Sequence, residues 1–362
     1  MAKPVLTNAP PDTQLSNPFT GVFRPALFTG VIIIASIALL ILVILACILS
    51  KTPGRTLYYF FIGPFRNVYS FGNMLNSATP LILGGLGVSI AMQTGNLNLG
   101  GEGQIYSGAF IATIIALPLA FFGFSGGLIA ILAGAFCAGA VAAISGFCKA
   151  RWNTNELITS FLLSNALILI VNYLVDGPFL DPETNLQSTR KIAPALRLPL
   201  ILPPSNLSAA LLIAIVIVII VHVFMKRSKM GYEFRMAGAN EIFARYGGIN
   251  TKRNTIIAMF LSGALYGLAG GLAVFGAYYA TIKEFSAGLG WNGLAAALIA
   301  GFYPPALIPA SLFLAWISSG ARIAMQNSDI TFEVASVVQS VIFFLATSVI
   351  LRTVFAKKEQ RR

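Results

Sequence analysis

The segment TGNLNLGGEGQ, residues 94–104, interrupts two apolar runs of the sequence with polar and glycine residues. Its eleven residues include four glycines, two asparagines, one glutamine and a single acid, Glu102. What such a segment does depends on whether the runs on both sides of it lie in a membrane.

The composition of the chain is that of a membrane protein. Of its 362 residues, 57% are hydrophobic and 10% are charged, and the mean hydropathy is +0.81. Soluble domains are about one quarter charged. Several apolar runs reach the roughly 20 residues that a helix needs to cross a bilayer. The sequence therefore predicts an all-α polytopic membrane protein.

The positions of the charged residues favour a lipid bilayer over nucleic acid as the partner. The net charge is +12, but the basic residues lie in connecting loops and do not form a patch interleaved with aromatic residues. Basic connecting loops are typical of the positive-inside bias of membrane proteins. The single histidine, His222, has no cysteine or second histidine near it in the sequence, so no metal site is predicted.

The distribution of lysine and arginine decides the number of spans. Ten spans with the N-terminus inside place 16 of the 24 basic residues on the cytoplasmic side and 8 outside, whereas nine spans leave 11 inside and 13 outside. The positive-inside bias favours ten. The expected spans are residues 26–49, 78–92, 103–122, 126–149, 157–175, 207–225, 255–280, 290–302, 306–324 and 334–354.

These spans predict one transmembrane domain, residues 26–354, with both termini in the cytoplasm. A cytoplasmic segment, residues 1–25, precedes the domain, and a basic cytoplasmic tail, residues 355–362, follows it. The loop 176–206 falls outside, and its prolines predict an irregular lid over the outer face. The loop 226–254 is the longest one on the cytoplasmic side.

Two of the expected spans are too short for a simple crossing. The run 78–92 has 15 residues and is followed by the segment 94–104, and the run 290–302 has 13 and ends in GFYPP. Short, interrupted segments at matching places indicate two pseudo-repeated halves with broken helices and a substrate path at their junction. Irregular backbone at membrane depth must be buried in protein or line a wet cavity, because lipid cannot satisfy its N–H and C=O groups. We therefore expect residues 94–104 to line the path.

The polar side chains of this segment are the first candidates for the path. An ionisable group at membrane depth is a functional candidate by default, which singles out Glu102. The alternative is that Glu102 caps the helix that follows it, since a negative charge is favourable at a helix N-terminus. Asn96, Asn98 and Gln104 add hydrogen-bond donors and acceptors.

A second set of candidates lies in NELITSFLLSNALILIVNYLV, residues 155–175. Phe161, Asn165 and Asn172 are four and seven residues apart, so they share one helical face. They could present an aromatic surface and amides to a cargo, or the amides could serve helix–helix hydrogen bonding instead. Asn292, in the second short run, completes the candidate path. Nearly all of these groups are uncharged, which favours a neutral, hydrogen-bonding solute, because a charged cargo usually demands an opposite charge at depth.

The cytoplasmic loop contains a short helix signal. Asn240 is a good N-cap, Glu241 follows in the first turn, and Gly247 and Gly248 end the pattern, so EIFARY is predicted to be a helix of under two turns. A helix this short is unstable in water by itself. Packing must hold it, and the apolar Ile242, Phe243 and Tyr246 favour a protein partner. The alternative is a basic loop lying on anionic lipid.

Three motifs then resemble a known family. MGYEFRMAGANEIFARYGGI resembles the coupling loop of ATP-binding-cassette (ABC) importer permeases of the branched-chain amino acid, ribose and nucleoside group. GNLNLGGEGQIYSGAF and NELITSFLLSNALILIVNYLVDGPFLDP are most similar to the nucleoside and simple-sugar permeases of that group. The resemblance runs from about residue 57 to 350. A second glycine precedes Glu102 here, where relatives often carry a bulkier residue, so the shape of the local pocket differs.

The resemblance implies a permease subunit of an ABC importer in the bacterial cytoplasmic membrane. The implied partners are a second permease subunit, expected to be a distinct paralogue, two cytoplasmic ATPase domains and an extracytoplasmic substrate-binding lipoprotein. ATP and Mg²⁺ would bind to the ATPases, and no cofactor to this chain. The implied cargo is a nucleoside or a simple sugar, with riboflavin as the alternative. The residues that the resemblance assigns to ATPase coupling are Gly231, Glu233, Arg235, Gly238, Asn240, Glu241, Phe243, Ala244 and Gly248.

Two other classes of protein fit the sequence less well. An ion-coupled carrier also uses broken helices in repeats, but it normally needs carboxylates at depth, where Glu102 is almost alone. A membrane-embedded enzyme needs a catalytic constellation such as a His/Asp pair or paired carboxylates, and none is found. The chain also lacks the P-loop pattern G-x-x-x-x-G-K-[ST], so no ATPase activity of its own is predicted.

Overall fold

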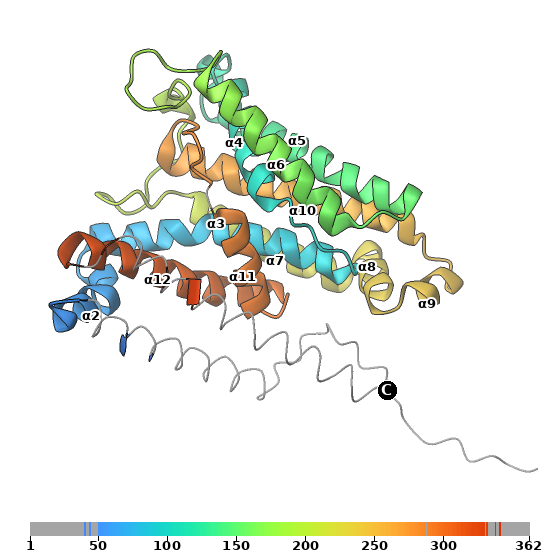
Figure 1. The fold of residues 1–362 in the computed structure, drawn as a ribbon. Helices are drawn as coiled ribbons and strands as arrows, with labels where there is room; N and C mark the ends of the chain where they lie inside the picture. The colour runs from blue at the N-terminus through green and yellow to red at the C-terminus, as the bar shows by residue number, and fades with distance from the viewer. Residues whose placement is uncertain are drawn as a thin grey trace, which may run out of the picture.

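The computed structural model describes residues 50–286 and 288–329, together with the isolated residues 40, 43, 44, 331, 337, 340 and 341. The described chain is all-helical, with three isolated β-bridges and no strand (Figure 1). The expected spans 26–49 and 334–354, and the expected terminal segments, fall outside the description except at those isolated positions. The α-helices are α2 (Pro53–Phe61), α3 (Val68–Gln93), α4 (Gly101–Ala116), α5 (Gly123–Trp152), α6 (Glu156–Asp176), α7 (Ala210–Arg227), α8 (Lys229–Ala239), α9 (Glu241–Tyr246), α10 (Thr251–Ala273), α11 (Leu289–Ile299) and α12 (Leu307–Asn327).

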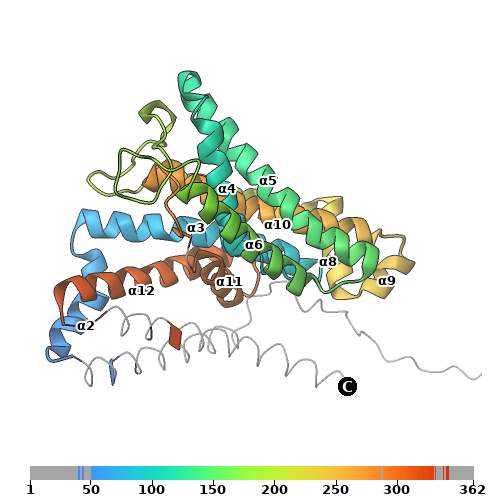
Figure 2. The same cartoon turned by 45° about the horizontal axis from the view of Figure 1, so that its top comes forward.

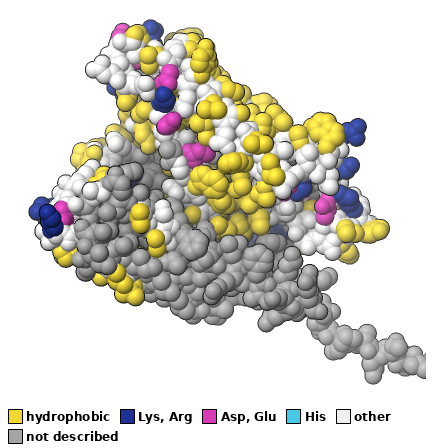
Figure 3. Space-filling model, in the orientation of Figure 1, with side chains coloured by type: hydrophobic (Ala, Val, Ile, Leu, Met, Phe, Trp, Pro, Cys, Tyr) yellow, Lys and Arg dark blue, Asp and Glu magenta, His cyan; other side chains and the backbone are white. Residues whose placement is uncertain are grey.

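Six helical stretches of the described chain are long and apolar enough to cross a membrane. They contain α3, α5, α6, α7, α10 and α12, and α10 is prolonged by a π-helical turn, Val274–Tyr278. Figure 3 shows hydrophobic side chains over the middle of the molecule, with an acidic side chain beside them, and Lys and Arg side chains mainly toward its ends. The chain is therefore a multi-pass membrane protein, while the total of ten spans remains a prediction.

The first of the two short spans is longer than expected. α3 has 26 residues and begins at Val68, so the expected span 78–92 covers only its second half. The helix extends because its polar first turns find partners: Asn67 Oδ1 accepts from the N–H of Ser70 at 2.7 Å, and Ser77 Oγ donates to the carbonyl of Asn73 at 2.9 Å. The expectation of a short crossing was wrong for this helix.

The short helices are instead α4 and α11, with 16 and 11 residues. α4 ends at Ala116 and not at residue 122, because Pro118 follows and cannot continue the helical hydrogen bonding. α11 was expected to be short, and it is. Gly301, at φ +60°, and the prolines after it form the expected turn between α11 and α12.

α10 lies at the centre of the bundle and packs against α3, α4 and α5. Small residues let these helices approach closely. A Cβ added to Gly108 of α4 would lie 2.4 Å from the Cα of Gly267, and one added to Gly267 would lie 2.6 Å from the Cβ of Ala138 on α5. The spacing of α4, α5 and α10 therefore depends on the absence of side chains at Gly108 and Gly267.

The segment between α6 and α7 has no α-helix, as its prolines predict, and it packs onto the loop that precedes α11. The N–H of Thr189 donates to the carbonyl of Thr281 at 3.0 Å, and that of Ile192 donates to Tyr279 at 2.8 Å. The guanidinium of Arg197 stacks 4.3 Å from the ring centroid of Tyr279. We call residues 177–209 the lid. The lid lies at one end of the bundle, and α8 and α9 lie at the other (Figures 1 and 2).

The short helix in the loop 226–254 is confirmed. α9 spans EIFARY, and Asn240 Oδ1 accepts from the N–H of Phe243 at 3.0 Å, as an N-cap does. Gly248, at φ +79°, follows the helix. The sequence prediction missed α8, whose cap is Ser228: its hydroxyl accepts from the N–H of Gly231 at 2.9 Å.

Candidate functional site

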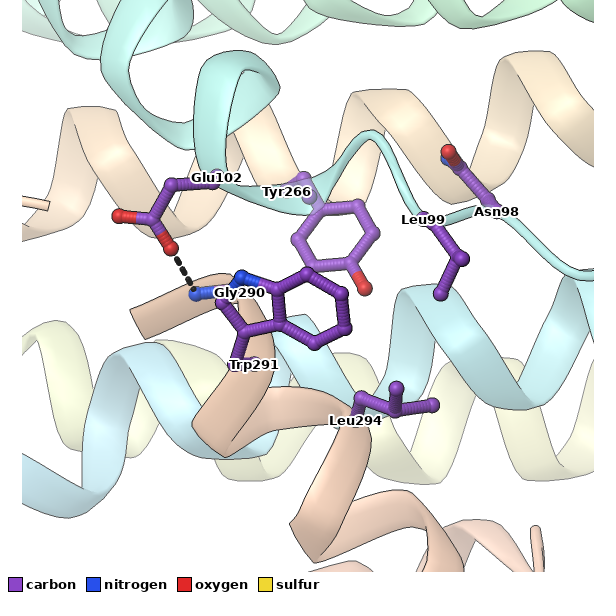
Figure 4. A pocket seen from close by; sticks show the side chains of 8 residues that line it. Asn98, Leu99, Glu102, Tyr266, Gly290, Trp291 and Leu294 are labelled. Atoms are coloured by element: carbon purple, nitrogen blue, oxygen red, sulfur yellow. Dashed lines mark hydrogen bonds between the residues drawn. The ribbon is translucent and has the colours of Figure 1, made fainter. Parts of the chain in front are cut away.

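The N-termini of the two short helices meet at Glu102. Oε2 of Glu102, in the first turn of α4, accepts a hydrogen bond from the backbone N–H of Gly290, in the first turn of α11, at 2.9 Å (Figure 4). The contact leaves no room for a side chain on Gly290, because a Cβ there would lie 2.4 Å from the backbone nitrogen of Glu102. Two helix starts, 188 residues apart in sequence, thus share one carboxylate.

The carboxylate supplies the cap that α11 lacks. The N-cap position of α11 is Gly288, at φ +83°, which has no side chain to accept from the free N–H groups of the first turn. An anion is favourable there because those groups form the positive end of the helix dipole. The sequence analysis offered Glu102 as a cap of its own helix, whereas in the structure its hydrogen bond goes to α11.

The junction lies near the middle of the membrane-spanning bundle. A Cβ on Gly101 would lie 2.5 Å from the ring of Tyr266, which stands 15 residues after the start of α10. At 1.5 Å per residue this is about 22 Å along the helix, roughly half of the thickness of a bilayer with its headgroups. Tyr266 itself is fully buried.

A small pocket opens beside the junction. It has room for about one water molecule, so the structure shows a closed arrangement. Figure 4 shows the Trp291 indole between the Glu102–Gly290 pair and the Tyr266 ring. The lining residues are Asn98, Leu99, Gly101, Glu102, Tyr266, Gly290, Trp291 and Leu294.

The amides of the segment 94–104 divide into one that lines the pocket and two that do not. Asn98 lines it, while its Nδ2 donates to Gln104 Oε1 at 2.8 Å and to Ser262 Oγ at 3.0 Å. Gln104 is buried, and its Nε2 donates a hydrogen bond to Asn98 Oδ1 at 3.2 Å. Asn96 is also buried and donates to Thr94 Oγ1 at 2.6 Å. Gln104 and Asn96 therefore support the shape of the segment.

Two serines of α6, which the sequence analysis missed, hold the extended segment and the start of α4. Ser160 Oγ accepts from the N–H of Leu99 at 3.1 Å, and Ser164 Oγ accepts from the N–H of Gly103 at 2.8 Å. These bonds satisfy backbone donors that lipid could not. Their four-residue spacing on one helix face was the available signal.

The candidates on α6 separate in the structure. Phe161 lies 6.4 Å from Trp291, centroid to centroid, so it borders the pocket region. Asn165 is exposed, and its Nδ2 donates to the carbonyl of Phe161 at 3.0 Å. Asn172 lies elsewhere. It accepts from the Tyr106 hydroxyl at 2.8 Å and serves helix–helix contact. Asn292 is half-buried on α11 and outside the pocket lining.

A set of polar contacts ties the loop before α11 to α4 and α6. Lys283 forms an ion pair with Asp176 at 2.5 Å, and Asn172 donates to Glu284 at 3.2 Å. The Tyr106 hydroxyl accepts from the N–H of Glu284 at 3.1 Å. The loop that leads into α11 is thus held to α4 and α6 at the lid end of the bundle.

At the opposite end, α8 and α9 form a compact element that touches the segment 94–104. Gly238 packs so closely that a Cβ there would lie 2.3 Å from the carbonyl oxygen of Gln93 and 3.1 Å from the nitrogen of Gly95. Asn254, in the first turn of α10, donates to Glu233 at 3.2 Å. α8 therefore packs directly on the residues that lead to Glu102.

The remaining residues assigned to coupling hold this element together or cap it. Arg245 pairs with Glu241 at 2.5 Å, and Arg235 donates to the carbonyl of Met225. Gly231 packs against the end of α7, where a Cβ would lie 2.4 Å from the carbonyl oxygen of Phe224. Ala244 is buried, whereas three apolar neighbours are exposed: Ile242 (68%), Phe243 (57%) and Tyr246 (89%).

The fold and the pocket define a class of protein: a helical membrane transporter in which broken helices meet at mid-depth. The chain belongs to the family described as branched-chain amino acid transport system / permease component, whose sequence model matches residues 70–347.

Curated relatives cover most of the chain. It is 32% identical to the "Probable riboflavin import permease protein" of Treponema pallidum, over 87% of this chain and 84% of the relative. It is 28% identical to the guanosine ABC transporter permease protein of Bacillus subtilis, over 83% and 87%. It is 30% identical to the glucose ABC transporter permease protein of Haloferax volcanii, over 80% and 79%. No solved structure matches the chain.

Proposed function

We propose that this chain forms one half of the translocation path of an ABC importer for a neutral, hydrogen-bonding solute, and that the solute is a nucleoside. The observation that carries the proposal is the meeting of α4 and α11 at Glu102, beside a pocket at mid-depth. A hydrogen bond between two helix starts is an interaction that a small relative movement can make or break. Opening of the path is a separation of α4 from α11, and the closed pocket is the resting arrangement.

The power for this movement comes from separate ATPase subunits that dock on α9. Three exposed apolar side chains on a six-residue helix are costly in water, and a protein groove would cover them. Gly238 then passes displacement of α8 to Gln93 and the segment 94–104. On this account, residues 231–248 are the coupling element and bind no nucleotide, since ATP and Mg²⁺ belong to the ATPases.

A second permease subunit, a distinct paralogue, lies opposite the face formed by α6 and α11, and the path runs between the two subunits. Asn165 is exposed between apolar residues of α6, and Trp291 is exposed at the start of α11. Polar groups at this depth are costly against lipid and favourable against protein or a wet path. An extracytoplasmic substrate-binding lipoprotein delivers the cargo to the lid. We place the complex in a bacterial cytoplasmic membrane, with both termini of this chain and α8 and α9 in the cytoplasm.

The relative named for guanosine supports the nucleoside assignment, and the one named for glucose supports a simple sugar as the second choice. The relative named for riboflavin supports a third. Asn98 and the carboxylate of Glu102 line the pocket and suit the hydroxyl and N–H groups that nucleosides and riboflavin share.

The test is import by the reconstituted complex. This chain, its partner permease, the ATPases and the lipoprotein are placed in proteoliposomes, and uptake of radiolabelled guanosine, riboflavin and glucose is followed with and without ATP. We expect ATP-dependent uptake of guanosine, reduced by excess unlabelled nucleoside. Uptake of glucose or riboflavin alone would overturn the nucleoside assignment, and no ATP-dependent uptake of any solute would overturn the permease function.

A further inference from the structure

Trp291 occupies an unusual place for a tryptophan in a membrane protein. Tryptophan is enriched at the two membrane–water interfaces, where its N–H stays near water. Trp291 instead stands in the first turn of the short helix α11 and lines the mid-depth pocket with Glu102 and Tyr266. Half of its surface (50%) is exposed. Packing within the chain therefore explains only part of its presence.

The neighbours of Trp291 leave one of its surfaces unused. Phe161 of α6 meets the indole edge-to-face, with centroids 6.4 Å apart and planes at 62°, and is itself 41% exposed. Among the described residues, the indole N–H has no hydrogen-bond partner. The two rings thus present an aromatic surface, next to the Glu102 carboxylate, that other side chains of the described chain leave open.

We propose that Trp291, bordered by Phe161, is the surface on which a planar heterocyclic ring of the cargo stacks during translocation. The inference rests on the proposed function and deepens it, because it restricts the cargo to solutes with an aromatic ring. Stacking is tolerant of the identity of the base, since every base presents a π-face. Glu102 and Asn98 then face the O–H or N–H donors at the edge of that cargo.

The placement also gives the cargo a role in opening the path. The backbone N–H of Gly290, which bonds to Glu102, belongs to the residue directly before Trp291. A ring that stacks on Trp291 contacts the first turn of α11, and the Glu102 carboxylate is hydrogen-bonded to the same turn. A donor group of the cargo competes with Gly290 for that carboxylate. Arrival of an aromatic cargo and release of the junction are therefore linked in one helix turn.

The first experiment measures import rates with the binding lipoprotein saturated by cargo, so that its own affinity does not enter. Trp291→Leu keeps an apolar side chain and removes the aromatic ring, whereas Trp291→Phe keeps a smaller ring. Removing an aromatic side chain that stacks on a base weakens binding by a factor of about five or more. We expect Trp291→Leu to import guanosine about fivefold or more slowly, and Trp291→Phe to remain within about twofold of the unchanged protein. The matched control is Leu162→Ala, at an exposed apolar residue next to Phe161.

The second experiment requires no change at Trp291. Trp152 and Trp316 are replaced by Phe, which leaves Trp291 as the only tryptophan of the chain. Fluorescence is then read in the complex, with the other subunits also free of tryptophan, after cargo is delivered and ATP hydrolysis is blocked. We expect quenching by guanosine but not by ribose, because only the base can stack on the indole.

The outcomes separate the inference from the function on which it rests. ATP-dependent import with unquenched Trp291, or with equal rates for Trp291→Leu and the unchanged protein, overturns the stacking role and leaves the permease function standing. Equal loss of guanosine import in Trp291→Leu and Trp291→Phe shows a structural role only and also overturns it. Failure of the unchanged complex to import any solute overturns the proposed function itself. To separate the sources of the donor group, import of 2′,3′-dideoxyguanosine tests the ribose hydroxyls and import of inosine tests the 2-amino group.

Discussion

Glu102 and Gly290 join the two broken helices of this protein through one hydrogen bond, 2.9 Å long, between a carboxylate oxygen and a backbone N–H. Contacts from both ends of the molecule converge there. At one end, the lid pairs with residues 279–283, which lead into α11. At the opposite end, α8 packs on Gln93, where the segment leading to α4 begins. On the proposed function, the junction is placed to respond to both a binding protein and an ATPase.

Removing the charge at the junction should slow transport without unfolding the protein. Glu102→Gln keeps the size of the side chain but replaces a charge-assisted hydrogen bond by a neutral one, which is about half as strong. Because the carboxylate caps α11, we expect a loss of stability of about 0.5–2 kcal/mol, seen as a lower melting temperature, and a clear loss of import rate.

The control for this change is Glu183→Gln, which removes an acid from an exposed position of the lid. It should leave both the melting temperature and the import rate unchanged. If Glu102→Gln melts and transports like the unchanged protein, the carboxylate neither caps α11 nor controls the path.

A bulky residue at position 238 should disconnect the ATPases from the path. In Gly238→Trp the new side chain meets the backbone of Gln93 and Gly95, so α8 must move away from them. We expect insertion in the membrane but no cargo-stimulated ATP hydrolysis. Gly247→Ala is the matched control in the same loop, because its Cβ would meet its nearest neighbour only at 3.4 Å.

The competing interpretation of this loop, a basic surface on anionic lipid, makes the opposite prediction. Each basic residue near such a surface contributes about 1 kcal/mol, so the double change Lys226→Gln with Arg227→Gln should impair function while Gly238→Trp is tolerated. If the paired charge removal alone abolishes ATPase stimulation, the coupling assignment of α8 and α9 is wrong.

Loosening the loop before α11 should raise ATP hydrolysis in the absence of cargo. Tyr106→Phe removes a hydroxyl that donates to Asn172 and accepts from the N–H of Glu284. The loss of these bonds costs about 1–3 kcal/mol, and α11 becomes freer to leave Glu102. We expect higher ATP hydrolysis without cargo, measured in the reconstituted complex. Tyr173→Phe, on an exposed tyrosine of the same region, should leave that basal rate unchanged.

Cysteine labelling tests the orientation of the chain. With Cys47, Cys137 and Cys148 replaced, an impermeant thiol reagent added to intact cells should label Lys191→Cys in the lid but not Tyr246→Cys in α9. Lys358→Cys, in the basic tail outside the described residues, should also stay unlabelled. Labelling of Lys358→Cys from outside would contradict the ten-span topology and its cytoplasmic C-terminus.

Much of the fold could be predicted from the sequence because hydrophobicity and helix caps act locally. Asn240 and the glycines after Tyr246 fix α9 wherever the loop lies, and the structure has α9 at those residues. The length of α3 could not be predicted in the same way. Its polar first turns look unfit for a membrane until Asn73 is seen to accept from the N–H of Asn206, far away in sequence.

The site was predictable in part for the same reason. Glu102 stood out because a lone acid among glycines is costly at membrane depth. Its partner did not stand out, since the donor is a backbone N–H and Gly290 offers no side-chain signal. Trp291 was missed because its depth depends on where α11 begins. For Asn172 the sequence left two roles open, because a shared helix face does not show which neighbour each residue meets, and its contact with Tyr106 agrees with helix–helix hydrogen bonding.

The most direct test of the central claim is the driving force of transport. Proteoliposomes that hold the complete complex are given labelled guanosine while ionophores collapse all ion gradients, and ATP is supplied or withheld on the ATPase side. The account predicts accumulation of guanosine with ATP, none without it, and none when Phe243→Asp disrupts the exposed apolar face of α9. Accumulation that needs an ion gradient and is unaffected by ATP or by Phe243→Asp would contradict it, and would make the protein an ion-coupled carrier.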